Sequence, residues 1–277
     1  MSEAPASRPE SDSGLRSFRL DLEYDGTGFA GWAAQPGRRT VEGVLREALD
    51  RVLPGGYRLA VAGRTDAGVH AAGQVASVAA PTGISSARLR GALMGLLPED
   101  CVAATVWEME PGFDARRDAA WRRYEYRVLP GPRSPLRRDR VLVHPPTLDL
   151  ERLNSAASRA VGRHDFRAFT PSHTLHTTFS RRLTRCVWDA RGDELVLTVQ
   201  GDTFLRHMVR VLVGTMLWVG RGVLPPEHME HLLAGAPRGD AGPTAPAHAL
   251  TLVEVGYEDA VTAGLGGAEA AATLGGP

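Results

Sequence analysis

The chain has 277 residues, of which 43% are apolar and 23% charged, an ordinary composition for a soluble globular protein of one or two domains. All 32 of its cationic residues other than histidine are arginines, so enzyme classes that need a Schiff-base, P-loop or kinase lysine are excluded. The sequence has no apolar run long enough to span a bilayer and no secretory signal, so we expect a cytoplasmic protein without a membrane partner. Cys101 and Cys186 lie far apart and are expected to be buried thiols.

The first half of the chain predicts elements in the order strand, helix, strand, strand, helix, strand. Apolar alternation predicts the first strand over 18–24, and Thr40 begins a helix that Pro54 ends. The elements that complete this half are strands at 57–62 and 73–79, a helix at 84–96 and a strand at 102–107. This order is that of a ferredoxin-like domain.

The second half repeats the order with longer elements. They are strands at 122–129, 183–188, 195–200 and 250–256, and helices at 150–161, 205–219 and 226–234. The helix at 205–219 is apolar on nearly all sides and should be central and buried. We therefore expect an α+β protein built from two ferredoxin-like (RNP-like) α/β domains with antiparallel sheets. The expected domains are 16–111 and 112–259, between disordered tails at 1–15 and 260–277.

A single carboxylate, Asp66, stands in the small-residue segment 62–71, AGRTDAGVHA, which follows a predicted strand. An ionised aspartate held on such a turn is a candidate nucleophile. The simpler interpretation is an Asx turn at the end of a strand, which is what most Asp-Ala-Gly segments form. The segment by itself leaves both interpretations open.

Positive charge is concentrated in the middle of the chain. Residues 116–191 contain 17 arginines and 7 acidic residues, although the whole chain is neutral. The interleaved aromatic residues are Trp121, Tyr124, Tyr126, Phe166 and Phe169. Because arginine binds phosphate through a planar fork and stacks on bases, this pattern indicates RNA or another polyanion as partner. The alternative is a set of ordinary solvated strand and helix faces.

Arg210 is the charged residue of the otherwise apolar helix predicted at 205–219, and it shares a face with His207 and Gly214. Burying a guanidinium without a partner costs several kcal/mol, so a carboxylate should lie beside it. Alternatively, the side chain reaches solvent at the end of the helix.

Five sequence blocks in a fixed order resemble the bacterial tRNA pseudouridine synthase A (TruA) family over about residues 18–257. The blocks are 23–27 with Gly31-Trp32, 63–71, 113–116 with 123–126, 207–210 with Gly214, and 242–248. The resemblance implies that uridines 38, 39 and 40 in the anticodon stem-loop of tRNA are isomerised to pseudouridine. It also implies a homodimer that binds tRNA on a basic surface of both subunits, with no cofactor, metal or ATP.

The resemblance assigns roles to individual residues. Asp66 matches the catalytic aspartate, and Arg210 matches the basic residue that pairs with it. Tyr124 matches the tyrosine that packs on the target base and is a candidate for proton transfer at C5. Arg64 matches an arginine that helps to hold the base outside its helix. The further substrate-binding candidates are Thr65, His70, Gln74, Phe113, Arg116, Arg123 and His207.

The chain departs from the family pattern at Ala33, Met94 and Asp114, where Gln, Asn and His are common. These positions bear on contacts with RNA and leave the reaction class unchanged.

Three other functions are compatible with parts of the sequence. An RNA-binding protein without turnover would have no need of Asp66. A dimeric aspartic protease would use the segment 65–68, although Ala follows the aspartate where Ser or Thr is expected. A metalloenzyme would use His173 and His176 with His164, which lie without a nearby carboxylate pattern.

Overall fold

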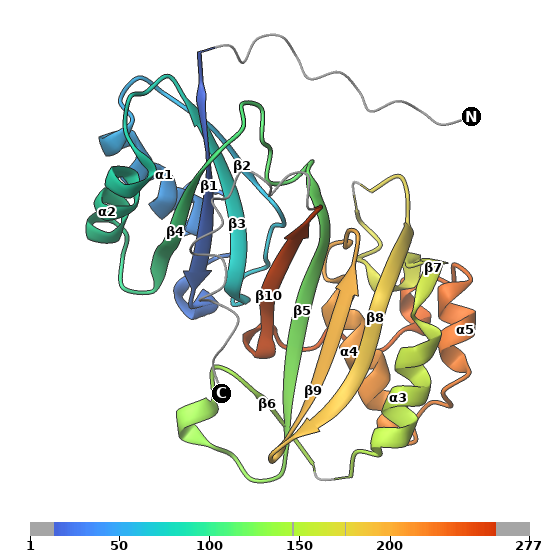
Figure 1. The fold of residues 1–277 in the computed structure, drawn as a ribbon. Coiled ribbons are helices and arrows are strands. Elements are labelled where there is room, and N and C mark those ends of the chain that lie inside the picture. The colour runs from blue at the N-terminus through green and yellow to red at the C-terminus, as the bar shows by residue number, and fades with distance from the viewer. Residues whose placement is uncertain (1–13, 146, 175, 259–277) are drawn as a thin grey trace, which may run out of the picture.

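The computed structural model describes residues 14–145, 147–174 and 176–258, so the expected tails lie outside it apart from Gly14 and Leu15. Its strands are β1 (Arg16–Tyr24), β2 (Arg58–Val61), β3 (His70–Ala80), β4 (Cys101–Met109), β5 (Ala119–Pro130), β6 (Leu142–His144), β7 (Gly162–Asp165), β8 (Ser180–Arg191), β9 (Glu194–Gly201) and β10 (Leu250–Tyr257). They form one mixed, mostly antiparallel sheet in the order β4-β1-β3-β10-β5-β9-β8-β7, with β2 paired to β3 and β6 to β5 (Figure 1).

The α-helices of the described residues are α1 (Val41–Val52), α2 (Ser86–Leu96), α3 (Leu150–Arg159), α4 (Met208–Gly220) and α5 (His228–Leu233). Figure 1 shows α1 and α2 beside the strands of the first half and α3, α4 and α5 beside β7, β8 and β9, with β10 and β5 in between. None of these helices is long and apolar enough to cross a bilayer. The fold is therefore α+β, as expected.

The two halves use the same strand order. Strands β1, β2, β3 and β4 lie in the order β4-β1-β3-β2, and β5, β8, β9 and β10 lie in the order β10-β5-β9-β8. The halves are joined where β10 pairs in parallel with the start of β3, through Thr251 with His70 and Leu252 with Ala71. Because of this pairing, β3 begins at His70 rather than at the expected residue 73.

Local sequence signals explain where α1 begins but not where α4 begins. The Thr40 side chain accepts a hydrogen bond from the Gly43 amide at 3.2 Å, an N-cap that confirms the expected start of α1. The expected start of α4 at residue 205 was wrong by three residues. Residues 205–207 form a turn instead, because His207 adopts a left-handed conformation with φ 62° and cannot continue a helix.

The core runs through both halves. Alternate residues of β1, among them Phe18 and Leu20, are fully buried, and α4 is buried along nearly its whole length, as predicted. Each large apolar side chain removed from water contributes about 1.5–3 kcal/mol. Cys101 and Cys186 are buried free thiols, and burial raises the pKa of each to about 12. They are therefore inert packing residues.

Candidate active site

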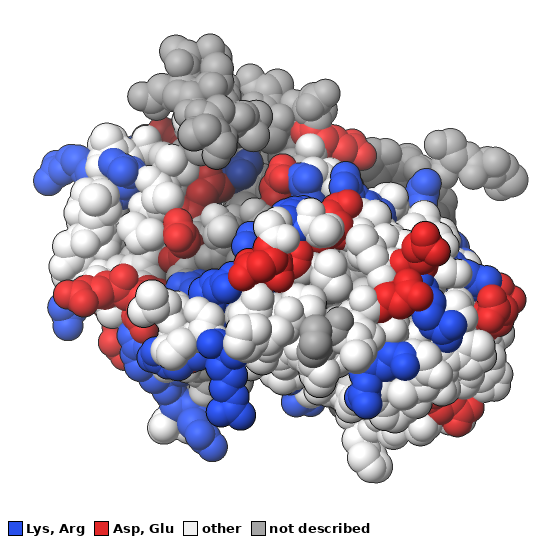
Figure 2. Space-filling view, turned by 90° about the horizontal axis from the view of Figure 1, so that it is seen from below, with Lys and Arg blue, Asp and Glu red and all other residues white. Residues whose placement is uncertain are grey.

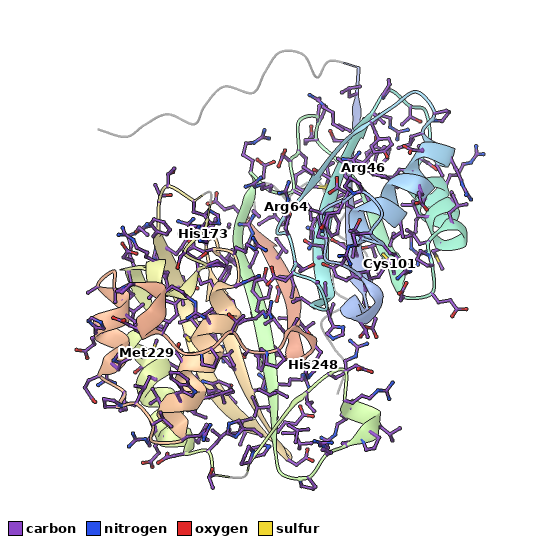
Figure 3. The ribbon with its side chains drawn as sticks, turned by 180° about the vertical axis from the view of Figure 1, so that it is seen from behind. Arg46, Arg64, Cys101, His173, Met229 and His248 are labelled. Atoms are coloured by element: carbon purple, nitrogen blue, oxygen red, sulfur yellow. The ribbon has the colours of Figure 1, made fainter. Side chains whose placement is uncertain are left out.

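A cleft of about 1430 Å³ lies between the two halves and contains Asp66. Its first wall comes from residues 30–35 and 59–69. Its second wall comes from residues 114–124 and 203–210, together with His173, Thr174 and His176. Arg64 of the first wall and His173 of the second lie at the same end of the molecule in Figure 3. Segments far apart in the sequence therefore face one another across Asp66.

Glycines of the first sequence block hold the Asp66 loop by close backbone contact. Gly31 has φ 99°, and a Cβ on it would lie 2.9 Å from the Thr65 carbonyl oxygen. The Trp32 amide donates a hydrogen bond to that same oxygen at 3.0 Å. A Cβ on Gly26 would overlap the Val69 carbonyl group. The loop conformation is thus set from outside by a backbone that approaches more closely than side chains would allow.

Buried hydrogen bonds hold the same loop from beneath. The Tyr24 and Thr65 hydroxyls lie 2.8 Å apart, and the Gln74 amide nitrogen donates to Tyr24 at 3.2 Å and to the Gly63 carbonyl at 2.7 Å. Thr65 and Gln74, both expected to bind substrate, are buried in this network. Thr65 lines the cleft with its hydroxyl bound to that of Tyr24, whereas Gln74 lies outside the cleft, and both position the Asp66 loop.

Asp66 makes an ion pair with Arg210 across the cleft. Arg210 Nη1 lies 3.0 Å from Asp66 Oδ2, and Arg210 Nε donates to the Ala245 carbonyl at 2.8 Å. The Asp66 side chain is 25% exposed, so it is open to the cleft, whereas the Arg210 side chain is 16% exposed. The expected carboxylate partner of Arg210 is therefore confirmed.

A close approach of two segments fixes Arg210 in turn. The Ala245 amide donates to the Arg210 carbonyl at 3.0 Å, and the Gly242 amide donates to the Thr215 hydroxyl at 2.9 Å. A Cβ on Gly214 would overlap the Pro243 carbonyl oxygen. The glycine of the fourth block thus lets residues 242–245 lie directly against α4.

His207 lies beside the same carboxylate. Its Nε2 is 3.7 Å from Asp66 Oδ2, and its side chain is 24% exposed. It is the one non-glycine residue with positive φ among those described, a conformation that costs roughly 1–2 kcal/mol. Burial lowers the pKa of the imidazole, and the charges of Arg210, Arg206 and Arg238 lower it further against the opposite effect of Asp66.

Tyr124 contributes an aromatic surface to the cleft. Its ring is 7% exposed and meets the Phe204 ring edge-on, with centroids 5.1 Å apart. Burial raises the pKa of its hydroxyl to about 12; Arg122 opposes this shift, and the charge of Asp66 adds to it. The hydroxyl is therefore protonated at neutral pH.

Arg122 is a cleft residue that sequence reasoning missed. Its guanidinium is buried and donates to four carbonyl groups through hydrogen bonds of 2.7–3.1 Å, without a carboxylate partner among the described residues. The acceptors are Ala62, Arg116, Ala119 and Asp202. They belong to three separate segments of the cleft wall, which this one side chain therefore connects.

The alternation of β5 could have identified Arg122. Arg122 lies two residues from Tyr124 and so shares its face of the strand, whereas Arg123 must face the other way. Arg123 pairs with Glu254 and lies over the Trp121 ring at 5.0 Å. Arg123, expected to bind substrate, is therefore not brought to the cleft.

Two other predicted substrate-binding residues also lie outside the cleft. His70 is buried; its Nδ1 accepts from the Gly26 amide at 3.0 Å, and its Nε2 faces the Asp139 and His248 carbonyls at 2.8 and 2.9 Å. Phe113 is buried against Tyr257, with ring centroids 5.5 Å apart. The side chains of His70 and Phe113 therefore hold neighbouring segments of the fold together.

The exposed arginines of the cleft are Arg64, Arg116, Arg117 and Arg206, of which Arg117 is paired with Asp118. Arg116 is presented by a turn in which Asp114 Oδ1 accepts from the Arg116 and Arg117 amides at 2.8 and 2.9 Å. Asp114, one of the departures from the family pattern, thus has a structural function here. These arginines can meet an anionic substrate.

Fewer arginines of residues 116–191 are free to bind an anionic partner than the net charge of this segment indicates. Nine of the 17 arginines in that segment have carboxylate partners, among them Arg137 with Asp193 at 2.7 Å. Figure 2 shows acidic side chains among the basic ones over much of the face seen from below, and a group of basic side chains at its lower left. The arginines of β7 and β8 that lack an ion pair with any described residue are Arg163, Arg181, Arg182 and Arg185.

The geometry of the cleft does not favour the metalloenzyme, the aspartic protease or the RNA-binding protein without catalysis. His173 and His176 line the cleft, but in the described parts of the chain no three His, Cys, Asp or Glu side chains are arranged to hold a metal ion. Asp66 is paired with an arginine, whereas an aspartic protease pairs two carboxylates that share a proton. Binding of RNA without catalysis would leave the Asp66–Arg210 pair unexplained.

The chain is similar in sequence to known proteins over most of its length. A family model described as tRNA pseudouridine synthase matches residues 156–258. The chain is 46% identical over 248 residues to tRNA pseudouridine synthase A of Frankia casuarinae, covering 88% of this chain and 90% of that protein. The proteins of the same name from Streptomyces griseus and Thermus thermophilus are each 43% identical to it, covering 90% and 88% of this chain and 90% and 98% of theirs. The chain therefore belongs to the tRNA pseudouridine synthase A family.

Proposed function

We propose that this protein isomerises uridine to pseudouridine at positions 38, 39 and 40 of the tRNA anticodon stem-loop, with Asp66 as the catalytic carboxylate. The observation that carries the proposal is the state of this one side chain. Arg210 binds Oδ2 at 3.0 Å, while Oδ1 accepts no hydrogen bond from any described residue. A carboxylate held on one oxygen and open on the other is arranged to react in the cleft.

We propose that the reaction uses the Asp66 carboxylate and its partner Arg210 in the cleft. The bond between N1 and the ribose C1′ breaks, the base turns, and C5 bonds to C1′, with no oxidation and no net hydrolysis. Asp66 can attack C1′, add to the uracil ring or promote formation of a glycal. Arg210 holds Asp66 Oδ2 at 3.0 Å in each case and so orients the carboxylate toward the bound base.

The target base must leave its helix to reach Asp66, at a cost of a few kcal/mol. Tyr124 and Phe204 provide an aromatic surface, and stacking on such a surface contributes roughly 1–3 kcal/mol per base. Arg64, Arg116 and Arg206 are exposed around the same cleft and would contact the phosphates of the splayed strand.

The organisation that we propose follows from family membership and from the repeated strand order. Residues 16–111 and 112–259 form two ferredoxin-like units, although residue 259 lies outside the described part. The protein acts as a cytoplasmic homodimer, and tRNA lies across cationic surfaces of both subunits.

Mapping of pseudouridine in tRNA tests the proposed positions. Transcripts carrying a single uridine at position 38, 39 or 40 are incubated with the wild-type protein and with the Asp66→Asn variant. We expect modification at each position by the wild type and none by the variant. Modification elsewhere in the tRNA would refute the positions, and tRNA binding without modification would favour the RNA-binding alternative.

A further inference from the structure

The base that takes the C5 proton has to lie near Asp66, because on each of the three routes Asp66 acts on an atom within two bonds of C5 once C5 is joined to C1′. His207 meets this condition, with Nε2 3.7 Å from Asp66 Oδ2 in the cleft. His207 is the N-cap residue of α4 and has a left-handed backbone with φ 62°, whereas the residues of α4 that follow it are helical. Strain of this kind is commonly retained at functional sites.

The charged groups around His207 come from every segment packed against it. Asp66 faces it from the loop of the first half, Arg210 from the next turn of α4, Arg206 from the residue before it and Arg238 from the segment ahead of β10. Burial and the three arginines lower the pKa of the imidazole, and Asp66 raises it by a smaller amount. The ring is therefore neutral at pH 7 and able to accept a proton.

The other titratable groups of the cleft are less suited to this step. The Tyr124 hydroxyl keeps its proton at neutral pH. Asp114 Oδ1 accepts two backbone amides, and Glu42 is paired with Arg46 at 2.8 Å. His173 and His176 lie on a separate segment of the wall and make no ion pair with Asp66.

We propose that His207 is the base that removes the C5 proton in the last step of the isomerisation, an inference that rests on the proposed function. Once C5 has bonded to C1′, C5 still carries its hydrogen. His207 Nε2 takes the proton, the C–H electrons form the C5–C6 double bond, and the C6–N1 π electrons move to N1, which takes up a proton from solvent. One proton leaves and one arrives, so the product remains an isomer of uridine.

The imidazolium formed in this step has a stabilising partner. Once Asp66 is free of the substrate, its carboxylate faces the charged ring at 3.7 Å. The same aspartate thereby begins the reaction and stabilises the cation that ends it. His207 then loses its proton to the solvent in the open cleft.

A glycine substitution separates this role from the backbone strain. His207→Gly is expected to fold, because glycine adopts positive φ without cost. We expect pseudouridine to form about 100-fold more slowly or slower still, the usual loss on removing a general base. Added imidazole should restore part of the rate. The matched control is His144→Gly, which removes a histidine outside the cleft and should leave the rate unchanged.

Two further readouts distinguish a base from a positioning residue. With tRNA that carries 5-deuterouridine, single-turnover kinetics of His207→Gly should show a primary isotope effect that the wild type lacks. The wild-type rate should rise with pH through a pKa below the usual histidine value and then level off, and the variant should lose this inflection. Wild-type kinetics of His207→Gly, or a slow variant without isotope effect and imidazole rescue, would overturn the assignment. A wild-type protein that forms no pseudouridine would instead refute the proposed function.

Discussion

The two walls of the cleft come from halves with the same strand order, but they differ in the charge of their side chains. The wall of the first half is held by glycine contacts and neutral hydrogen bonds around one carboxylate, as Gly31, Thr65 and Gln74 show. The wall of the second half contains Arg116, Arg122, Arg206 and Arg210. The first half therefore supplies the reacting carboxylate, and most of the arginines around it come from the second half.

The walls meet in two contacts of different physical kind. Arg210 reaches Asp66 as an ion pair at 3.0 Å, whereas Arg122 reaches the Ala62 carbonyl through hydrogen bonds of 2.7 and 3.0 Å. The first contact orients the reacting carboxylate and places a cation beside it, and the second fixes the position of its loop. Substitutions on the two sides should therefore affect activity and stability in different proportions.

The largest effect among these substitutions is expected at the ion pair. Arg210→Leu leaves Asp66 without a cationic partner and should lower the single-turnover rate by about 100-fold or more, the usual scale for one lost charge-stabilising donor in an active site. Arg210→Lys keeps the charge but loses the fork that also binds Ala245, so its rate should be intermediate. Equal rates for the leucine variant and the wild type would remove the pair from the mechanism.

Loss of the second contact should act on stability. Arg122→Gln leaves several buried carbonyls without donors and should lower the free energy of unfolding by about 2–4 kcal/mol, measured by urea denaturation. The matched control is Arg123→Gln on the opposite face, for which we expect less than about 1 kcal/mol. Similar losses in both variants would show that the buried hydrogen bonds of Arg122 contribute no more to the free energy of unfolding than the exposed ion pair of Arg123.

A smaller loss of stability is expected where α4 meets residues 242–245. Gly214→Ala places a methyl group against the Pro243 carbonyl and should cost about 1–3 kcal/mol by overpacking. It should also lower activity, because this segment holds Arg210. Gly91→Ala in α2 meets open space, and we expect it to stabilise the protein by about 0.5–1 kcal/mol. A neutral Gly214→Ala would contradict the close approach.

The smallest effect is expected at the exposed rim. Arg116→Gln should weaken tRNA binding several-fold at low salt and reduce the slope of log Kd against log salt by about one, as for one lost phosphate contact. Arg138→Gln removes an arginine that is exposed outside the cleft and paired with Asp139, and it should change neither quantity. Filter binding over a salt series measures both variants, and equal effects would indicate a general charge effect.

Sequence periodicity predicted the longer elements because their signals are local. The Thr40 cap and the apolar face of α1 lie within a few turns, and so does the apolar stretch of α4. The parallel pairing of β10 with β3 and the short strands β6 and β7 were not predicted, since partners distant in sequence determine them. The left-handed His207 has no local signal of the kind that a glycine gives.

The candidate site was predicted unevenly for a related reason. Asp66, Tyr124 and Arg210 were named from sequence blocks, and the structure brings all three to one cleft. Arg122 was missed because an arginine within a basic segment suggests a solvated side chain, although the alternation of β5 places it on the face of Tyr124 and its neighbour Arg123 on the other face. His70 and Gln74 were expected at the substrate, but their contacts are with the fold itself.

The most direct test of Asp66 is tritium release from tRNA that carries 5-tritiated uridine, with the wild type compared with Asp66→Asn. Formation of the bond at C5 expels this hydrogen, so release reports isomerisation and not binding. We expect release by the wild type, none by the variant, and the same affinity of both for tRNA. Release by Asp66→Asn at a substantial fraction of the wild-type rate would contradict the assignment of Asp66 as the catalytic carboxylate.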